Sequence, residues 1–306
     1  LSLVSQTALH EALRGVLLSP EWLENDLTHR LTQALYDRLD ELPELPAKFG
    51  FAMDTGRLPV LQGCSADIRL ETSKDGRLLL IEDGADFGLS VSQDTAISAL
   101  ISLAHRFSKA VRGSKPNTRM QNLPLPLQSG QDGHAYKRQV SGASLPLGIT
   151  ALGLHLAPAF GQTTSQDFTK LLIQFDCKFL RLTPWRGLLL ERVSDLPISP
   201  GFISDEHDPK RRIQVCPGAP ACQSAKGNTR GFAAQMAPQL AANPALNSKE
   251  LHISGCAKGC AQPQKADLTF VAQNLGFDLI VKGHAWDKPI KTGLDPDIIL
   301  QNLDGF

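Results

Sequence analysis

The sequence has no excess of charge of one sign and no long apolar run. It holds 31 basic and 31 acidic residues, so its formal net charge is zero. A balanced chain creates no overall field that favours nucleic acid or an anionic membrane. No apolar stretch approaches the roughly 20 residues of a membrane span, and no secretory signal is visible. We therefore expect a cytoplasmic protein with neither nucleic-acid nor membrane partners.

Two functional patterns are also missing. No G-x-G-x-x-G motif follows a predicted strand, so the chain shows no nicotinamide site of its own. The eight histidines are scattered, and no H-x-D or H-x3-H pair marks a set of ligands for a single iron ion. His252 is the histidine nearest the cysteine motifs, and strand alternation is expected to turn it toward a sheet neighbour.

Cysteine is scarce but patterned. Four of the six cysteines form two close pairs, C-x5-C at Cys216 and Cys222 and C-x3-C at Cys256 and Cys260. Glycine, alanine and proline surround both pairs, which lets backbone amides approach sulfur without steric hindrance. A [4Fe–4S] cluster needs four thiolates with N–H groups directed at their sulfurs. The spacing therefore predicts a [4Fe–4S] cluster ligated by these four residues.

Three other roles for these cysteines are less consistent with the pattern. Disulfides are disfavoured in a large cytoplasmic domain. Structural zinc usually takes C-x2-4-C knuckles, and C-x5-C is wide for one. Buried unreactive cysteine is common singly, but four in two tight motifs fit that role poorly. The remaining two cysteines, Cys64 and Cys177, are expected to be dispensable.

The residues around the cysteines resemble a known family. The segment 215–225 reads V-C-P-G-A-P-A-C-Q-S-A, and 252–261 reads H-I-S-G-C-A-K-G-C-A. The cysteine spacing is similar to the cluster signature of the sirohaem-dependent nitrite and sulfite reductases. The flanking residues are more similar to a related family, the precorrin-3B synthases, with patterns CPGxPxCxSA and HxSGCAKGCA. The turn Thr183 to Leu190, T-P-W-R-G-L-L-L, resembles the TPWxxLLL turn of the reductase family.

Periodicity and composition divide the chain into five segments. Residues 1–45 have apolar residues at helical spacing, with Asn25 or Asp26 as the N-cap of a second helix. Residues 46–111 alternate as strands and then form a helix. Residues 112–143 are rich in Pro, Gly, Ser, Gln and Asn and are expected to be a linker. Residues 144–200 form a strand–helix–strand unit, and residues 201–306 carry the cysteine motifs.

The last segment repeats a pattern of the second. Ala266-Asp267-Leu268-Thr269-Phe270 matches Ala66-Asp67-Ile68-Arg69-Leu70, and the residues from Gly276 match those from Gly76. The same comparison places Leu251-His252-Ile253 opposite Phe49-Gly50-Phe51. Two such copies suggest a duplicated architecture. The first copy has Cys64 alone, so the predicted cluster belongs to the second.

The resemblance implies an α+β fold with the duplicated nitrite/sulfite reductase-like architecture. In that architecture ferredoxin-like half-domains alternate with two larger α/β domains. Residues 46–111 would be the first α/β domain, without a cluster, 144–200 the second half-domain, and 201–306 the cluster-carrying domain. The first half-domain would be truncated, with residues 1–45 holding its tail. Because the chain begins at Leu1 without a methionine, we expect a fragment that is poorly soluble or inactive alone.

The resemblance also implies a tetrapyrrole with many carboxylates, which basic side chains must bind because unpaired buried charge is very costly. Within family-like motifs or beside the cluster, the candidate substrate-binding residues are Lys48, Arg186 and Lys258. The wider set adds Arg69, Arg181, Lys210, Arg211 and Arg212. Sulfite reductases carry K-F-K where this chain has Lys48-Phe49-Gly50. Loss of the second lysine predicts that a metal-free tetrapyrrole, rather than sulfite or nitrite, is the substrate.

The function that the resemblance implies is the monooxygenation of precorrin-3A in aerobic cobalamin biosynthesis, with closure of a γ-lactone. The cofactors implied are the [4Fe–4S] cluster, a mononuclear non-haem iron and NADH-derived electrons from a reductase or ferredoxin partner. No catalytic residue and no ligand of the second iron is assigned. The alternatives are a sirohaem-dependent nitrite or sulfite reductase, with Cys260 bridging cluster and haem, and a non-catalytic iron–sulfur electron-transfer protein.

Overall fold

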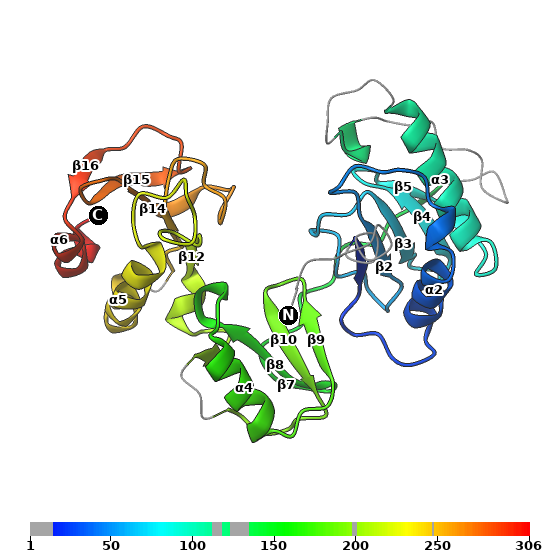
Figure 1. Cartoon of the computed structure of the whole chain (residues 1–306), viewed down its shortest axis with the longest axis horizontal. Helices are drawn as coiled ribbons and strands as arrows, with labels where there is room; N and C mark the ends of the chain where they lie inside the picture. The colour runs from blue at the N-terminus through cyan, green and yellow to red at the C-terminus, as the bar shows by residue number, and fades with distance from the viewer. Residues whose placement is uncertain (1–14, 112–117, 123–134, 198–200, 247) are drawn as a thin grey trace. The chain divides into compact units, whose positions relative to one another are not determined.

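The computed structural model describes residues 15–111, 118–122, 135–197, 201–246 and 248–306 (Figure 1). The chain divides into two compact units, an N-terminal unit, Leu1–Leu145, and a C-terminal unit, Pro146–Phe306. Both units mix helices with sheets. Within the described residues, no helix has the length and apolar character needed to cross a bilayer.

The N-terminal unit is built on a six-stranded sheet. Its order is β1 (Val16–Leu18), β2 (Phe51–Asp54), β3 (Ile68–Thr72), β4 (Leu78–Glu82), β5 (Phe87–Val91) and β6 (Ala135–Lys137). The first three strands are parallel and the remaining pairings are antiparallel. Two helices, α2 (Leu27–Tyr36) and α3 (Ala96–Ala110), contact each other and pack on this sheet.

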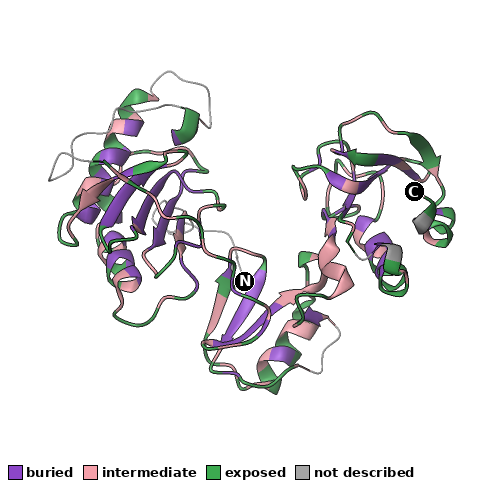
Figure 2. Ribbon diagram, turned by 180° about the vertical axis from the view of Figure 1, so that it is seen from behind, coloured by how far each residue is buried: buried purple, intermediate pink, exposed green. Residues whose placement is uncertain are grey.

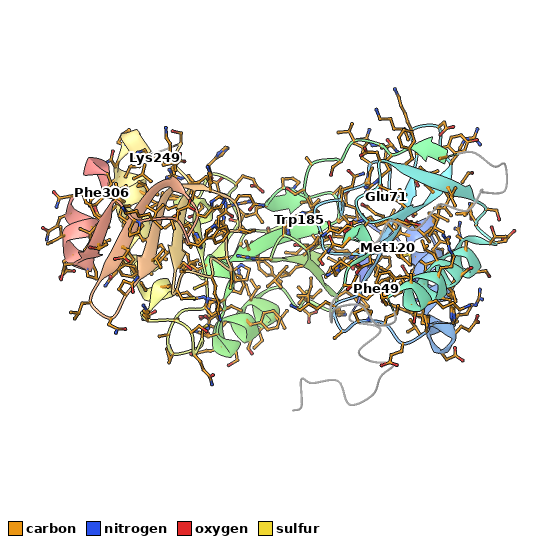
Figure 3. The ribbon with its side chains drawn as sticks, turned by 90° about the horizontal axis from the view of Figure 1, so that it is seen from above. Phe49, Glu71, Met120, Trp185, Lys249 and Phe306 are labelled. Carbon is orange, nitrogen blue, oxygen red and sulfur yellow. The ribbon has the colours of Figure 1, made fainter. Side chains whose placement is uncertain are left out.

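Side-chain alternation explains which face of this sheet is covered. Met53, Ile68 and Leu70 point toward the helices, where they join Phe49 and Met120, both labelled in Figure 3, in one buried core. Asp26 is the N-cap of helix α2, and its Oδ1 accepts a hydrogen bond from the His29 N–H at 2.7 Å. This capping contact satisfies an N–H that the helix leaves free. Of the two residues predicted as the cap, Asn25 and Asp26, the structure has Asp26.

Two predictions for this unit were wrong. Val16 and Leu17 form strand β1 rather than helix, because they pair in parallel with Phe51 and Ala52 at the sheet edge. The region expected to be a linker contains a short 3-10 helix, η2 (Met120–Asn122), and strand β6. Both are held by the sheet, since Met120 is buried in the core and β6 pairs with β5. Residues 1–14, part of the predicted helical segment, lie outside the described residues.

The C-terminal unit contains two sheets. The first consists of β7 (Gly148–Thr150), β8 (Gly153–Pro158), β9 (Leu180–Thr183), β10 (Gly187–Glu191) and β11 (Phe202–Ile203), with β8 and β10 central. Helix α4 (Ser165–Gln174) packs its Leu171 against it. Because β11 pairs with β8, this sheet extends past the predicted boundary at residue 200.

The second sheet of this unit carries the cysteine motifs. Its order is β12 (Ile213–Val215), β13 (Leu251–Ser254), β14 (Ala266–Ala272), β15 (Phe277–Gly283) and β16 (Lys291–Leu294). Helices α5 (Thr229–Ala242) and α6 (Pro296–Gln301) cover one face over a core of buried residues, and Figure 2 shows the central strands buried. Short 3-10 helices lie at Leu39–Glu41, Ala159–Gly161, Pro209–Arg212, Pro244–Leu246 and Leu303–Gly305.

The sheets of β1–β5 and of β12–β16 have the same connectivity. In each, two parallel pairings are followed by two antiparallel pairings. One polar contact also recurs, because Asp67 Oδ2 accepts from Gly50 N at 3.0 Å and Asp267 Oδ2 accepts from Glu250 N at 2.9 Å. The shared register places Phe51 opposite Leu251. The sequence comparison, which had placed Phe49 there, was therefore shifted by two residues.

Candidate functional site

The two cysteine motifs begin at the ends of neighbouring parallel strands. Cys216 directly follows β12, and Cys256 lies just after β13, in a pairing where Val215 is opposite Ile253. Parallel strands deliver their following loops to the same sheet edge, a common position for binding sites. A hydrogen bond of 2.8 Å from Lys226 N to Gly255 O joins the two loops. The fold therefore brings together two motifs that are distant in sequence.

The sulfur of Cys216 has the environment expected of a cluster ligand. The residue is buried, and the Gly255 N–H donates to its Sγ at 3.1 Å. Such amide contacts stabilise a ligating thiolate. The Thr229 hydroxyl donates to the Cys216 carbonyl at 2.8 Å and fixes the backbone. A Cβ on Gly255 would approach Ala225 Cβ to 2.6 Å, so glycine is required for this contact.

The other three cysteines are more accessible. Cys222 and Cys256 are half-buried, Cys260 is exposed, and all four are free thiols. Among the described residues, no group of three His, Cys, Asp or Glu side chains is arranged to hold one metal ion. Ligands of a [4Fe–4S] cluster bind four separate irons and so stay further apart than ligands of one ion. The donor chemistry therefore fits a cluster, while the four-cysteine assignment and the ligands of a second iron stay predictions.

A pocket of about 220 Å³ lies beside the motifs. Cys216 and Cys260 line it together with two arginines, Arg186 and Arg230. Arg186 lies in the turn between β9 and β10, which Trp185 marks in Figure 3, and Arg230 lies in the first turn of α5. The structure thus brings one predicted residue, Arg186, to the cysteines. Sequence analysis missed Arg230, because an arginine on a helix has no distinguishing pattern.

The other predicted basic residues are not gathered at this pocket. Lys258 Nζ donates to Ser224 Oγ at 3.0 Å and joins the two cysteine loops. Lys48 is exposed in the N-terminal unit. Most of the wider set has partners within the chain: Arg69 pairs with Asp83, Arg181 with Glu191, Lys210 with Asp208 and Arg211 with Glu206, and Arg212 donates to the Leu246 carbonyl. These pairings give the wider set structural roles.

Gly50 has a packing role that the sequence did not indicate. It is buried, and a Cβ at this position would lie 3.1 Å from the Gly15 carbonyl oxygen and 3.3 Å from that of Ser65. Contacts this close require the neighbouring backbone to shift. The glycine is therefore explained by backbone packing, which weakens the argument that its presence reports on the substrate.

His252 lies beneath the C-x3-C loop on β13. It is fully buried between Gln214 and Thr269 of the neighbouring strands, and neither ring nitrogen has a hydrogen-bond partner in the part of the chain that the structure describes. Burial lowers the pKa of His252 to about 4, because the charged ring loses its hydration. The ring is therefore neutral near pH 7.

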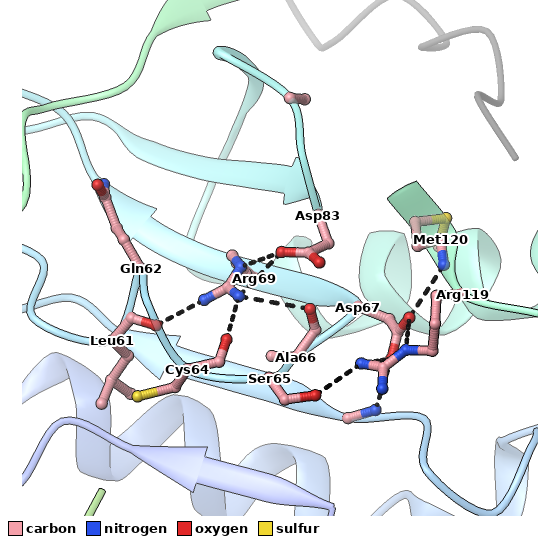
Figure 4. A network of polar contacts seen from close by, with 12 residues as sticks. Leu61, Gln62, Cys64, Ser65, Ala66, Asp67, Arg69, Asp83, Arg119 and Met120 are labelled. Atoms are coloured by element: carbon pink, nitrogen blue, oxygen red, sulfur yellow. Dashed lines mark hydrogen bonds and ion pairs between the residues drawn. The ribbon is translucent and has the colours of Figure 1, made fainter. Parts of the chain in front are cut away.

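At the matching edge of the first sheet, the loops are held by an ion pair and by hydrogen bonds of charged side chains, and the two cysteine motifs of the second sheet have no counterpart here. Arg69, 1% exposed, donates to the carbonyls of Leu61 and Cys64 at 2.8 and 2.6 Å and pairs with Asp83 at 2.9 Å (Figure 4). Asp54, at the end of β2, accepts from Leu61 N at 2.7 Å. These contacts fix the loop that follows β2, in the place where β13 is followed by the C-x3-C motif.

Comparisons with known proteins show sequence similarity to two groups of enzymes. It is 36% identical over 162 residues to precorrin-3B synthase of a Sinorhizobium species, a match covering 47% of this chain and 34% of that protein. It is 23% identical over 247 residues to the large subunit of the NADH nitrite reductase of Escherichia coli K12, covering 78% of this chain and 28% of that protein. No family model matches the chain.

A solved structure shows the same fold. The NirA protein of Mycobacterium tuberculosis aligns with a TM-score of 0.57 and 16% identity, covering 94% of this chain and 66% of the NirA chain. The chain spans about a third of the length of the two curated relatives. The chain is thus similar in sequence to a precorrin-3B synthase and to a nitrite reductase subunit, and similar in fold to NirA.

Proposed function

We propose that this chain is the cluster-carrying part of a precorrin-3B synthase-like monooxygenase. The main support is the position of the C-x5-C and C-x3-C motifs at adjacent parallel strand ends, beside a pocket that contains Arg186 and Arg230. The 36% identity to a precorrin-3B synthase adds to it. The shared connectivity of the two larger sheets supports the further proposal that the architecture arose by duplication.

The reaction consumes O2, two electrons from NADH and two protons. One oxygen atom enters precorrin-3A as a hydroxyl with γ-lactone closure, and the other leaves as water. A cluster held by Cys216, Cys222, Cys256 and Cys260 would supply electrons one at a time. The chain's own residues would hold the substrate, since guanidinium groups bind carboxylates through paired hydrogen bonds. The Gly255 N–H would stabilise the Cys216 thiolate.

The test of this proposal is turnover of precorrin-3A by the full-length gene product. The reaction contains O2, NADH and a reductase, and mass spectrometry follows the tetrapyrrole. We expect a product heavier by one oxygen atom, with the label of 18O2 and without the label of H218O in the new hydroxyl. An unchanged tetrapyrrole with a fully loaded cluster would overturn the proposal.

A second candidate function is a sirohaem-dependent nitrite or sulfite reductase. It is favoured by the match to the nitrite reductase subunit, which extends over 78% of this chain. Expression with a supply of sirohaem separates the two functions. A precorrin-3B synthase-like protein should be brown without haem absorption bands, whereas stoichiometric sirohaem would establish the reductase. Failure to bind any tetrapyrrole would instead favour a non-catalytic electron-transfer protein.

A further inference from the structure

The pocket beside Cys216 and Cys260 carries unbalanced positive charge. Arg186 and Arg230 both line it, and no Asp or Glu occurs among its lining residues. Arg186 and Arg230 differ in this respect from the other basic candidates, each of which has an acidic partner: Arg69, Arg181, Lys210 and Arg211. Among the described residues, therefore, no carboxylate neutralises the charge of these two cations.

Neither arginine has an acidic partner among the described residues, so both guanidinium groups are available to an anionic ligand. Within the described part of the chain, Arg230 donates to two neutral oxygens, through Nε to the Phe160 carbonyl at 3.4 Å and through Nη1 to the Gln162 side chain. Arg186 is exposed and has no hydrogen bond or ion pair with another described residue. Burial lowers the pKa of Arg230, and the positive charge of Arg186 lowers it further. The two cations thus share one small pocket.

The backbone around the pocket is held in an uncommon conformation on two sides. Phe160 and Arg186 have φ angles of 56° and 59°, in the left-handed region, although neither is glycine, and both line the pocket. Residues in this region tend to cluster at ligand clamps, where the surrounding fold enforces them. Gly187 follows Arg186 and allows no side chain, because a Cβ would collide with His155 and Thr183. The turn therefore holds the Arg186 position firmly.

We propose that Arg186 and Arg230 together bind one carboxylate of the substrate, and that this residue pair sets the position of the macrocycle edge relative to Cys260. The inference rests on the proposed function, which supplies a polycarboxylate tetrapyrrole. The pocket, at about 220 Å³, is smaller than the roughly 300 Å³ at which sites for whole ligands begin. It suits an acetate or propionate arm rather than the ring. Two guanidinium groups can hold both oxygens of such an arm.

The experiment measures binding of uroporphyrin I, a metal-free octacarboxylate tetrapyrrole, by quenching of its fluorescence on the cluster-loaded chain. The variants are Arg186→Gln, Arg230→Gln and the double variant, with Arg230→Lys as the conservative change. The matched control is Arg192→Gln. Arg192 is also an exposed arginine with positive φ, but it follows β10 whereas Arg186 precedes it. Iron content and thermal unfolding are measured for every variant, so that loss of structure is recognised.

We expect each single variant to weaken uroporphyrin binding by about tenfold to a hundredfold, as for loss of a charge-assisted hydrogen bond. The double variant should be little weaker than either single one, because both arginines hold the same carboxylate. Arg230→Lys should be intermediate and Arg192→Gln unchanged. If the losses of binding free energy in the two single variants add up in the double variant, the proposal that both arginines bind the same carboxylate is overturned.

Other outcomes identify which proposal fails. Equal affinity of the native chain and all variants would overturn the role of the arginine pair while leaving the tetrapyrrole proposal standing. If the native chain binds no uroporphyrin, inorganic phosphate is titrated instead, followed by its protection of the chain against thermal unfolding. Protection that requires both arginines would mean a small inorganic anion is the ligand, which overturns the carboxylate assignment and the tetrapyrrole proposal with it.

Discussion

Asp54 offers a test of the ionic network that holds the N-terminal unit. Its side chain is fully buried, Oδ2 accepts from Leu61 N, and Oδ1 has no hydrogen-bond partner among the described residues. Burial, with a smaller contribution from the nearby Glu71 charge, raises the pKa of Asp54 from 3.8 to about 6. Substitution by asparagine removes the ionisation and keeps an oxygen for the Leu61 N–H. We therefore expect Asp54→Asn to be more stable than the native chain at pH 8.

The sign of the expected stability difference between Asp54→Asn and the native chain follows from proton linkage. A carboxyl whose pKa is raised by folding stabilises the fold below its unfolded pKa, and this contribution is lost as the pH rises through about 6. When Asp54 is ionised in both the folded and the unfolded chain, a pKa raised by about two units lowers the free energy of unfolding by roughly 3 kcal/mol. The stability advantage of Asp54→Asn should therefore grow by roughly 2 kcal/mol between pH 4 and pH 8.

Urea unfolding of the N-terminal unit measures this difference. Trp22 is the tryptophan of that unit, so its fluorescence reports locally once Trp185 and Trp286 are replaced by phenylalanine. Asp86→Asn is the matched control, because Asp86 is exposed on the β4–β5 hairpin. A stability difference between Asp54→Asn and the native chain that is constant with pH would refute the reasoning.

Three further substitutions test other parts of the account. Arg69→Met should destabilise the N-terminal unit by about 3–5 kcal/mol, since it leaves a buried ion network without its cation, and urea unfolding with an unchanged midpoint would contradict this. Gly255→Ala should lose iron because its Cβ would approach Ala225 Cβ to 2.6 Å, whereas Gly63→Ala, with nothing within 4 Å, should keep it; equal iron contents in the two variants would disprove the steric argument. The pKa of His252 is lowered to about 4, so the C-terminal unit should become less stable as the pH falls from 6.5, by on the order of 3 kcal/mol at pH 4. His252→Leu should lose this pH dependence when urea unfolding is followed across pH.

The sequence predicted those elements whose signals are local. The β3–β4 and β14–β15 hairpins follow from alternation around Gly76 and Gly276, whose φ angles of 82° and 80° are those of turn glycines. The cysteine spacing likewise predicted which loops form the candidate site. Strand β1 could not be predicted, because Val16 and Leu17 fit a helical pattern and become a strand only through pairing with residues more than 30 positions away.

Long-range contacts also explain what was missed at the site. Arg230 becomes notable only when folding places it in one pocket with Arg186, 44 positions earlier in the chain, with no acidic residue among the described residues that line the pocket. Strand β6 is three residues long and mainly exposed, so its composition resembles a loop. Arg69 belongs to the wider set of candidate substrate-binding residues because a sequence does not show burial, and the fold instead uses its charge to fix a loop.

The most direct test of the central claim is the iron and acid-labile sulfide content of the anaerobically purified chain, with electron paramagnetic resonance after reduction. We predict about four of each per chain and a [4Fe–4S]+ signal. Cys216→Ser, Cys222→Ser, Cys256→Ser and Cys260→Ser should each lose or destabilise the cluster. Cys64→Ser and Cys177→Ser should retain it. A normal cluster in the Cys256→Ser protein would contradict the account.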